Sequence, residues 1–316
     1  MYHPYFRGKQ YELITIRESA QLMKQAGFVP IIEPVKESFS GLKRALHAVA
    51  EEGGECVLVV NPQHGDYVGM SEQIEELLAN DYGGARRIGA GIIAGPAISL
   101  PEVRAIFDRQ IESRDVAIIH AGFPDGKSLA RHLGDRRVRH VFLEESCGKL
   151  YRRAFQFEGA TRVLIRDGFQ RRANRNHPKV EPYSELHATF REERMDGFGD
   201  YLIVGDEFTE GGGPAYAVAI HLTFIDRTQD EQMFIHHFVS DDRDTPTDPA
   251  GKFKQALDKL VREVDRSDTQ VSKTKAVTEF LQLHENGHYP GLGYVKKLSM
   301  LHHIETLAEF FRREQG

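Results

Sequence analysis

Short apolar runs, separated by polar or amphipathic segments, recur along the chain from residue 28 to residue 222. Most of these runs are continuous rather than alternating in polarity, which is typical of strands that are covered on both faces, as in a parallel sheet. The pattern predicts eight strands, over residues 28–33, 56–60, 88–93, 116–120, 141–144, 162–166, 201–204 and 217–222.

The segments between these strands have the periodicity of helices. In residues 42–52 the apolar side chains of Leu42, Ala45, Leu46 and Val49 repeat with a helical period. Helices are also expected over residues 71–79, 100–111, 128–133 and 150–157. This alternation predicts an α/β fold, and eight units favour a (β/α)8 TIM-barrel-like domain over the alternative, a doubly wound open sheet.

The regions that flank the strand pattern are mainly helical. We expect an N-terminal helical lead (1–27, with a helix over 8–25), a barrel (28–250) and a C-terminal segment (251–316) with helices over 253–264, 271–284 and 294–310. Residues 233–239 predict a ninth strand in a hairpin with the eighth. The polar stretch 167–200 is too long for an ordinary loop and indicates a functional or partly ordered insertion. With no internal repeat or low-complexity linker, we expect residues 1–316 to form a single domain.

The composition excludes several classes of protein. With 40% hydrophobic residues and a formal net charge of −6, the 316-residue chain lacks the basic balance of a general nucleic-acid coater. No apolar run approaches the ~18 residues that a membrane span needs. The two cysteines cannot form a disulfide scaffold or a four-cysteine zinc site. The first residues also lack the apolar region of a secretory signal, so we expect a cytoplasmic protein that does not bind a membrane.

Acidic side chains follow several of the predicted strands. In a TIM barrel the reactive groups lie where strands end and the next loops begin. Carboxylate oxygens suit Mg²⁺ or Mn²⁺, and histidines at the same edge add zinc as a less favoured choice. The metal ligands that this pattern predicts are Glu33, Glu144, Asp167 and Asp206. The alternatives are that these carboxylates cap helices, pair with arginines or form a general acid–base pair.

Polar residues near the same strand ends supply candidates for proton transfer and substrate binding. His120 ends the fourth predicted strand and Glu145 follows the fifth, so both are candidate catalytic residues. Between residues 162 and 179 several arginines form a local basic patch, and guanidinium groups bind phosphate bidentately. The predicted substrate-binding residues are Lys36, Asn61, Arg166, Arg172, Arg175 and His237. Lys36 is also the expected counter-charge of Glu33, and the alternative role of Asn61 is to stabilise a turn.

Several segments carry a resemblance to known proteins. They are MYHPYFRGKQYEL (1–13), PIIEP (30–34), Asn61-Pro62, FGDY (198–201) and PGLGYVKKLSMLHH (290–303). Together they resemble an uncharacterised bacterial family and, more remotely, the phage and bacterial beta family proteins. The similarity spans essentially the whole chain. It implies a partner protein, because the relatives are often encoded beside a putative nuclease in defence-like loci, and it implies no reaction and no catalytic residue.

These observations support two main hypotheses. The first is a divalent-metal-assisted hydrolase or related enzyme that acts on a phosphate-containing substrate at the barrel mouth, for which the resemblance implies a place in a phage-defence or mobile-element system. The second is a non-catalytic barrel that binds and regulates a partner nuclease or toxin. Sequence-tolerant nucleic-acid binding through the arginine-rich loop is a third alternative, and the C-terminal helices offer a surface for a homo-oligomer.

Overall fold

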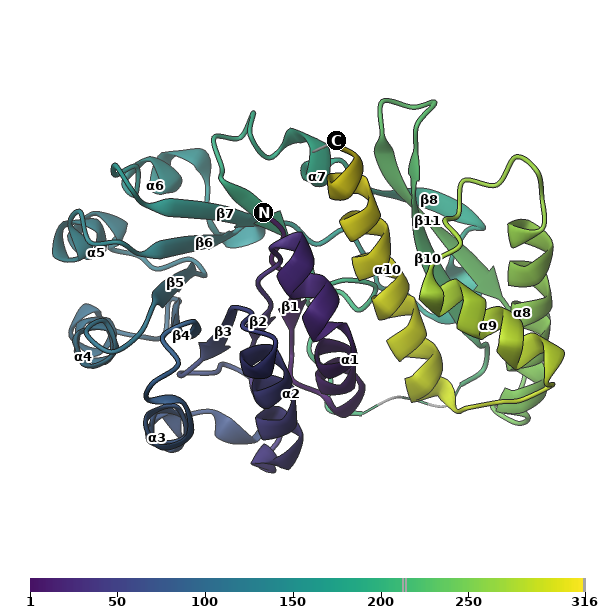
Figure 1. Cartoon of the computed structure of the whole chain (residues 1–316), viewed down its shortest axis with the longest axis horizontal. Coiled ribbons are helices and arrows are strands. Elements are labelled where there is room, and N and C mark those ends of the chain that lie inside the picture. Colours follow the sequence, from purple (N-terminus) through teal and green to yellow (C-terminus); the bar gives the residue numbers. More distant parts are fainter. Residues whose placement is uncertain (212, 214, 315–316) are drawn as a thin grey trace. The chain divides into compact units, whose positions relative to one another are not determined.

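Eight parallel strands form the barrel that the sequence predicts (Figure 1). The computed structural model describes every residue except 212, 214, 315 and 316. Each barrel strand pairs with the next one along the chain, except that β7 pairs with β9. The strands are β1 (Tyr5–Phe6), β2 (Ile31–Ile32), β3 (Cys56–Val59), β4 (Ile88–Ala94), β5 (Val116–His120), β6 (Arg139–Leu143), β7 (Thr161–Ile165) and β9 (Gly197–Gly199).

The barrel closes between the first residues of the chain and β9. Tyr2 forms a parallel bridge with Phe198, and the His3 amide donates to the Phe198 carbonyl at 2.8 Å. A Cβ atom on Gly199 would lie 2.1 Å from the carbonyl oxygen of His3, so only glycine permits this close approach. The prediction of a TIM-barrel-like fold is therefore confirmed.

Two of the eight predicted strands do not belong to the barrel. Residues 201–204 form a turn, and the run predicted over 217–222 contributes to a different sheet. The barrel uses β1 and β9 instead. Because these strands contain only two and three residues, and β9 is Gly-Phe-Gly, neither produces an apolar run long enough to stand out.

Six helices follow the barrel strands and lie outside them (Figure 1). They are α1 (Gln10–Ala26), α2 (Phe39–Glu51), α3 (Ser71–Tyr82), α4 (Leu100–Gln110), α5 (Gly126–Leu133) and α6 (Lys149–Arg153). Local sequence fixes their ends. A capping box between Ser99 and Glu102 starts α4, and Gly27 ends α1 in the left-handed conformation (φ 68°).

The chain divides into two compact units. The barrel unit contains residues 1–166 and 189–200, and the second unit contains residues 167–188 and 201–316. From the sequence we expect residues 1–316 to form one domain, whereas the contacts group them into two compact units. The division arises because the chain leaves the barrel after β7, supplies one strand to another sheet and returns through the short helix α7 (Leu186–Thr189) to β9.

The second unit contains a three-stranded antiparallel sheet, in the order β10-β11-β8. Its strands are β8 (Val180–Ser184), β10 (Ala219–Asp226) and β11 (Gln232–Val239). The predicted hairpin is confirmed, because β10 and β11 pair along their full lengths. The long insertion predicted over 167–200 supplies β8, and three C-terminal helices follow the hairpin, α8 (Pro249–Val264), α9 (Lys275–Glu285) and α10 (Leu292–Glu314).

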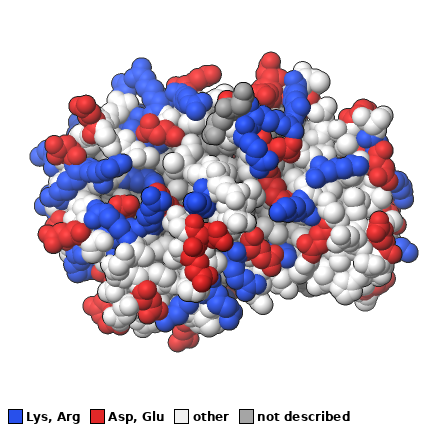
Figure 2. Space-filling view, viewed as in Figure 1, with Lys and Arg blue, Asp and Glu red and all other residues white. Residues whose placement is uncertain are grey.

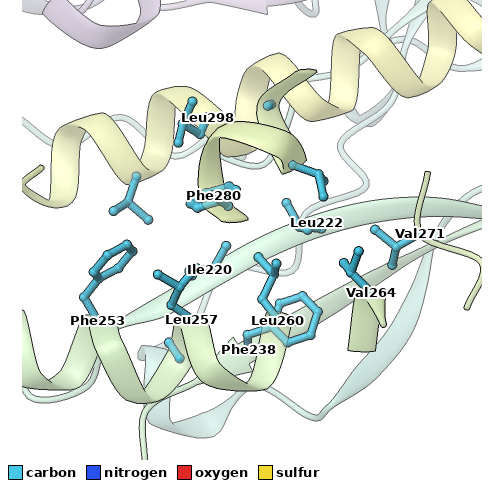
Figure 3. Packing of buried hydrophobic residues seen from close by; sticks show 14 of the residues in the cluster. Ile220, Leu222, Phe238, Phe253, Leu257, Leu260, Val264, Val271, Phe280 and Leu298 are labelled. Atoms are coloured by element: carbon cyan, nitrogen blue, oxygen red, sulfur yellow. The ribbon is translucent and has the colours of Figure 1, made fainter. Parts of the chain in front are cut away.

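The two faces of this sheet differ in chemistry. Ile220 and Leu222 of β10 and Phe238 of β11 pack with apolar side chains of the C-terminal helices, among them Leu260 and Phe280 (Figure 3). Side chains alternate between faces along a strand. The intervening residues of both strands therefore point away from this core, and histidines occupy two of those positions.

Helix α10 covers the edge strand β10. The His302 Nε2 group donates to the carbonyl oxygen of Thr223 (2.8 Å), and the Thr223 hydroxyl lies 2.8 Å from His303 Nδ1. These bonds satisfy backbone and side-chain groups at an edge that would otherwise be free to pair with another strand. The paired histidines of the PGLGYVKKLSMLHH segment thus have a structural role.

Candidate functional site

The first cluster of strand-end polar residues surrounds Glu33, which follows β2 and is completely buried. Its Oε2 atom accepts hydrogen bonds from the Tyr5 hydroxyl (3.0 Å) and from Arg7 Nη1 (2.5 Å). Its Oε1 atom accepts from the Gln63 amide (2.8 Å) and from His64 Nδ1 (3.0 Å). Both carboxylate oxygens are therefore occupied by donors of the protein itself.

The electrostatics of Glu33 follow from these neighbours. Burial alone raises the pKa of the carboxyl group, but the hydrogen bond from His64 and the positive charge of Arg7 outweigh it, so the pKa lies below its ordinary value. The counter-charge of Glu33 is Arg7. We expected Lys36 in this role, but Lys36 lies on the surface, with its Nζ atom 3.8 Å from Oδ1 of Asp66. The loop after β3 contacts Glu33 through His64.

Two other predicted residues stabilise the carboxyl edge of the barrel. The side chain of Asn61 accepts from the Ile93 amide (2.8 Å) and donates to the Ile93 carbonyl (2.9 Å), which ties β3 to β4. Glu144 forms a bidentate ion pair with Arg166, at 2.5 and 2.9 Å. Asn61 therefore bonds to backbone groups, and Glu144 pairs with an arginine. Both are alternatives to the roles in substrate and metal binding that the sequence suggests. Glu145 is exposed in the turn after β6.

His120 lies in the packing of the barrel rather than at an open surface. Its Nε2 atom is 3.1 Å from His140 Nδ1, its Nδ1 atom is 2.9 Å from the Tyr151 hydroxyl, and its ring packs on Phe142 and Phe155. Burial, followed by the charge of His140, lowers the pKa of His120 well below its ordinary value. Both ring nitrogens thus have hydrogen-bonding partners within the barrel unit.

The remaining predicted metal ligands belong to the second unit. Asp167 accepts hydrogen bonds from the backbone amides of Phe169 (2.9 Å) and Asp206 (2.8 Å). The predicted set of four is therefore divided, with Glu33 and Glu144 in the barrel unit and Asp167 and Asp206 in the other.

A second cluster of polar residues, the histidine cluster, consists of His177, His221 and His237. Cross-strand pairing places His221 of β10 opposite His237 of β11, on the sheet face away from the apolar core. His177 precedes β8, at the end of a turn that the Asn174 side chain anchors to the Ala217 carbonyl (2.9 Å). One nitrogen from each of the three rings lies within 4.8 Å of the other two. Among the residues that the structure describes, this is the one such group of three metal-ligating side chains.

Hydrogen bonds within the histidine cluster fix the proton positions. His237 Nε2 lies 3.0 Å from a carboxylate oxygen of Glu181, which can only accept, so Nε2 carries the proton. In a neutral ring the Nδ1 atom of His237 then has a lone pair, which accepts a hydrogen bond from His221 Nδ1 at 2.7 Å. The Nδ1 atom of His177 is buried and makes no hydrogen bond, and it lies 3.7 Å from Oε1 of the same Glu181 carboxylate.

Burial keeps all three rings neutral near pH 7. It lowers the pKa of His237 to about 4, lowers that of His221 well below its ordinary value, and lowers that of His177. The neighbouring histidines add to this effect at His237 and His221, and Arg172 adds to it at His177. Neutral imidazole is the form that binds metal ions.

A basic hollow of about 490 Å³ adjoins the histidine cluster, and His177 and His237 form part of its wall. One acidic residue, Glu263, also lines it. The basic residues of its wall are Lys179, Arg243, Lys259, Arg262 and Arg266. This excess of positive charge is local, because basic and acidic side chains are interspersed over the face of the molecule in Figure 2.

The predicted substrate-binding residues of the second unit have different neighbours and different exposure. Arg172 donates to Glu181 at 2.8 Å and so contacts the carboxylate that orients His237. Arg175 is exposed, and its carbonyl accepts from Arg243 at 3.5 Å. His237 is the predicted residue that the structure brings into the histidine cluster.

Sequence reasoning missed His177 and His221. His221 lies within an apolar run, and His177 lies in a loop whose arginines dominate the pattern. One signal was present, since a hairpin that turns near residue 229 places residues 221 and 237 directly opposite each other.

Comparisons with known proteins add no further information about this site. No family model, curated protein or solved structure matched the chain. Every helix in the described part of the chain is too short or too polar to span a membrane.

Proposed function

We propose that the protein is a metal-assisted hydrolase of phosphate-containing substrates, whose metal centre is the histidine cluster of the second unit. The observation that carries this proposal is the convergence of three neutral imidazoles, one with an unpartnered buried nitrogen, beside a hollow lined with cations. The proposed metal ligands therefore differ from the four strand-end carboxylates that the sequence suggests.

The donor set favours a particular class of metal. Three histidine nitrogens with one position left open are typical of catalytic zinc sites, whereas Mg²⁺ and Mn²⁺ prefer oxygen ligands. Glu181 supports the same assignment, since a carboxylate that accepts from the remote nitrogen of a histidine fixes its orientation and increases its basicity as a ligand. We therefore propose Zn²⁺ or a similar transition metal.

The basic hollow supports a phosphate-containing substrate. Lysine and arginine side chains there attract the negative charge of a phosphate group, and arginine binds it bidentately. The metal would supply Lewis-acid activation of water or of a phosphoryl oxygen. In this proposal the side chains of the hollow hold the substrate, and Glu181 positions His237.

Metal binding by the full chain tests the proposal directly. After treatment with a chelator, the protein is titrated with Zn²⁺, Co²⁺, Mn²⁺ and Mg²⁺, and binding is followed by thermal shift and by the visible spectrum of bound Co²⁺. We expect one tightly bound Zn²⁺ or Co²⁺ per chain and at least a 100-fold loss of affinity in His221→Asn. The matched control is His187→Asn, because His187 is also buried in the second unit, but its Nε2 atom lies 2.9 Å from the Glu231 carbonyl and it does not line the hollow.

Hydrolysis is then measured with 4-nitrophenyl phosphate and bis(4-nitrophenyl) phosphate. Activity that requires Zn²⁺ or Co²⁺, and that His221→Asn removes while His187→Asn retains it, supports the proposal. Equal metal affinity in wild type and His221→Asn would overturn the assignment. Metal binding without hydrolysis would instead favour the non-catalytic alternative, a barrel protein that binds a partner.

A further inference from the structure

A small cavity of about 160 Å³ lies at the amino-terminal end of the barrel unit. Its wall includes Arg162, at the start of β7, Arg152, at the end of α6, and Met195, just before β9. Because the strands of the barrel are parallel, this is the end opposite to Glu33 and Glu144. The cavity is therefore separate from both polar clusters described above.

Two arginines of this wall are more than nine-tenths buried. Arg152 is 4% exposed and Arg162 is 7% exposed. Their hydrogen bonds leave part of each guanidinium group unused, because Arg152 Nη1 and Arg162 Nε are buried and have no partner. A buried donor of a charged group without a partner destabilises the folded protein, so the site is incomplete as it stands.

The protein provides only weak compensation for these charges. Glu193 lies 3.4 Å from Arg152 and 3.6 Å from Lys149, both long for an ion pair. Arg162 Nη1 donates to the Arg194 carbonyl at 2.6 Å, which is a neutral partner. The wall also contains Arg153, so it has five basic residues and two acidic ones, Glu192 and Glu193.

We infer that this cavity is a binding site for a small oxyanion of the size of phosphate, held by Arg152 and Arg162. The cavity is large enough for one such group, and the guanidinium groups of the two arginines that line it would bind its oxygens in charge-assisted hydrogen bonds. Burial lowers the pKa of Arg162, and the nearby charges of Arg152 and Arg194 lower it further against the opposing effect of Asp196. A bound anion would relieve this repulsion.

Titration of the full chain with inorganic phosphate tests the inference. Calorimetry is performed at constant ionic strength, with Arg262→Ala/Arg266→Ala as the parent protein, because the basic hollow of the second unit also attracts phosphate. We expect one phosphate per chain, and at least a tenfold loss of affinity in Arg152→Gln. Methyl phosphate is titrated in parallel, and binding of both probes indicates a terminal phosphate group, whereas phosphate alone indicates the free ion.

A milder variant keeps the test decisive if Arg152→Gln does not fold. Arg153→Ala/Arg194→Asn changes two exposed residues of the wall, and asparagine tolerates the left-handed conformation that Arg194 adopts (φ 58°). We expect it to weaken phosphate binding several-fold. Arg137→Ala, an exposed arginine of the same unit that does not line the cavity, is the control. Absence of phosphate binding in the parent, or equal affinity in the wall variants and the control, would overturn the inference.

Discussion

The barrel mouth and the histidine cluster both contain the residue types that chemistry needs, but they differ in how those residues are already used. At the barrel mouth, Glu33 accepts hydrogen bonds at both oxygens, and Glu144 is paired with Arg166. In the histidine cluster, His177 has a buried nitrogen without a partner, and His237 directs a lone pair at a second histidine.

This difference shows that residue type alone does not identify a metal ligand. A carboxylate that is already bound to a guanidinium group must lose a charged partner before it can bind a cation, whereas a neutral imidazole that accepts from another imidazole has only to release a neutral hydrogen bond. Charge supports the same distinction. The barrel mouth balances its acids with arginines, and the hollow beside the histidine cluster keeps an excess of cations.

The largest expected effect comes from breaking the buried ion pair of the barrel mouth. Arg7→Met leaves the Glu33 carboxylate buried and without its cation, and we expect it to lower the free energy of unfolding by about 3–5 kcal/mol. Arg166→Met breaks the pair with Glu144, whose side chain is 30% exposed, and we expect a loss of about 0–1 kcal/mol.

Urea unfolding of the two variants at pH 7 measures this contrast directly. Their side-chain change is identical and both arginines follow barrel strands, so the comparison isolates burial. A similar decrease in the free energy of unfolding of the two variants would contradict the view that the buried Glu33 pair stabilises the barrel mouth more than the Glu144 pair does.

A smaller effect is expected in the second unit, from the carboxylate that orients His237. Glu181→Gln keeps the size of the side chain but removes its charge, and we expect metal affinity to fall about 10- to 100-fold, which is about 1.4–2.7 kcal/mol. The titration with Co²⁺ measures this decrease in metal affinity. As a control, Glu193→Gln changes a partly buried carboxylate of the barrel unit. Unchanged metal affinity in Glu181→Gln would remove this residue from the proposed metal centre.

The smallest effect is the pH dependence of the Glu33 ion pair. Because the pKa of Glu33 in the folded protein lies below its unfolded value of about 4.3, its contribution to stability is complete above that pH. The contribution is lost as the pH falls through the folded pKa. The stability difference between wild type and Glu33→Gln is therefore expected to narrow below pH 4 in urea unfolding. A stability difference between wild type and Glu33→Gln that stays constant from pH 7 to pH 3 would contradict the expected direction of the pH dependence.

The sequence predicts the fold better than the site for a physical reason. A parallel strand covered on both faces must be apolar throughout, so β3 to β7 are visible as local runs. The strands that close the barrel depend on contacts between distant parts of the chain and leave no local pattern. The partner of a carboxylate is equally non-local, since Arg7 and Glu33 are 26 residues apart and Arg166 and Glu144 are 22 apart.

The histidine cluster illustrates the same limit. His237 could be identified from its position in a predicted strand, but its role depends on His221, 16 residues away, and on Glu181, 56 residues away. Only the register of the hairpin and the return of β8 beside β11 bring these residues together.

Closure of the barrel between Tyr2 and Phe198 has a consequence for synthesis on the ribosome. The two residues that meet there are almost two hundred positions apart. At 5–20 residues per second, roughly 10 to 40 s pass before the second follows the first out of the exit tunnel. During that time one side of β1 remains an open strand edge, and one side of β7 becomes a second one when that strand emerges. The barrel unit therefore exposes two edges to pairing with another nascent chain between the emergence of β7 and the arrival of β9.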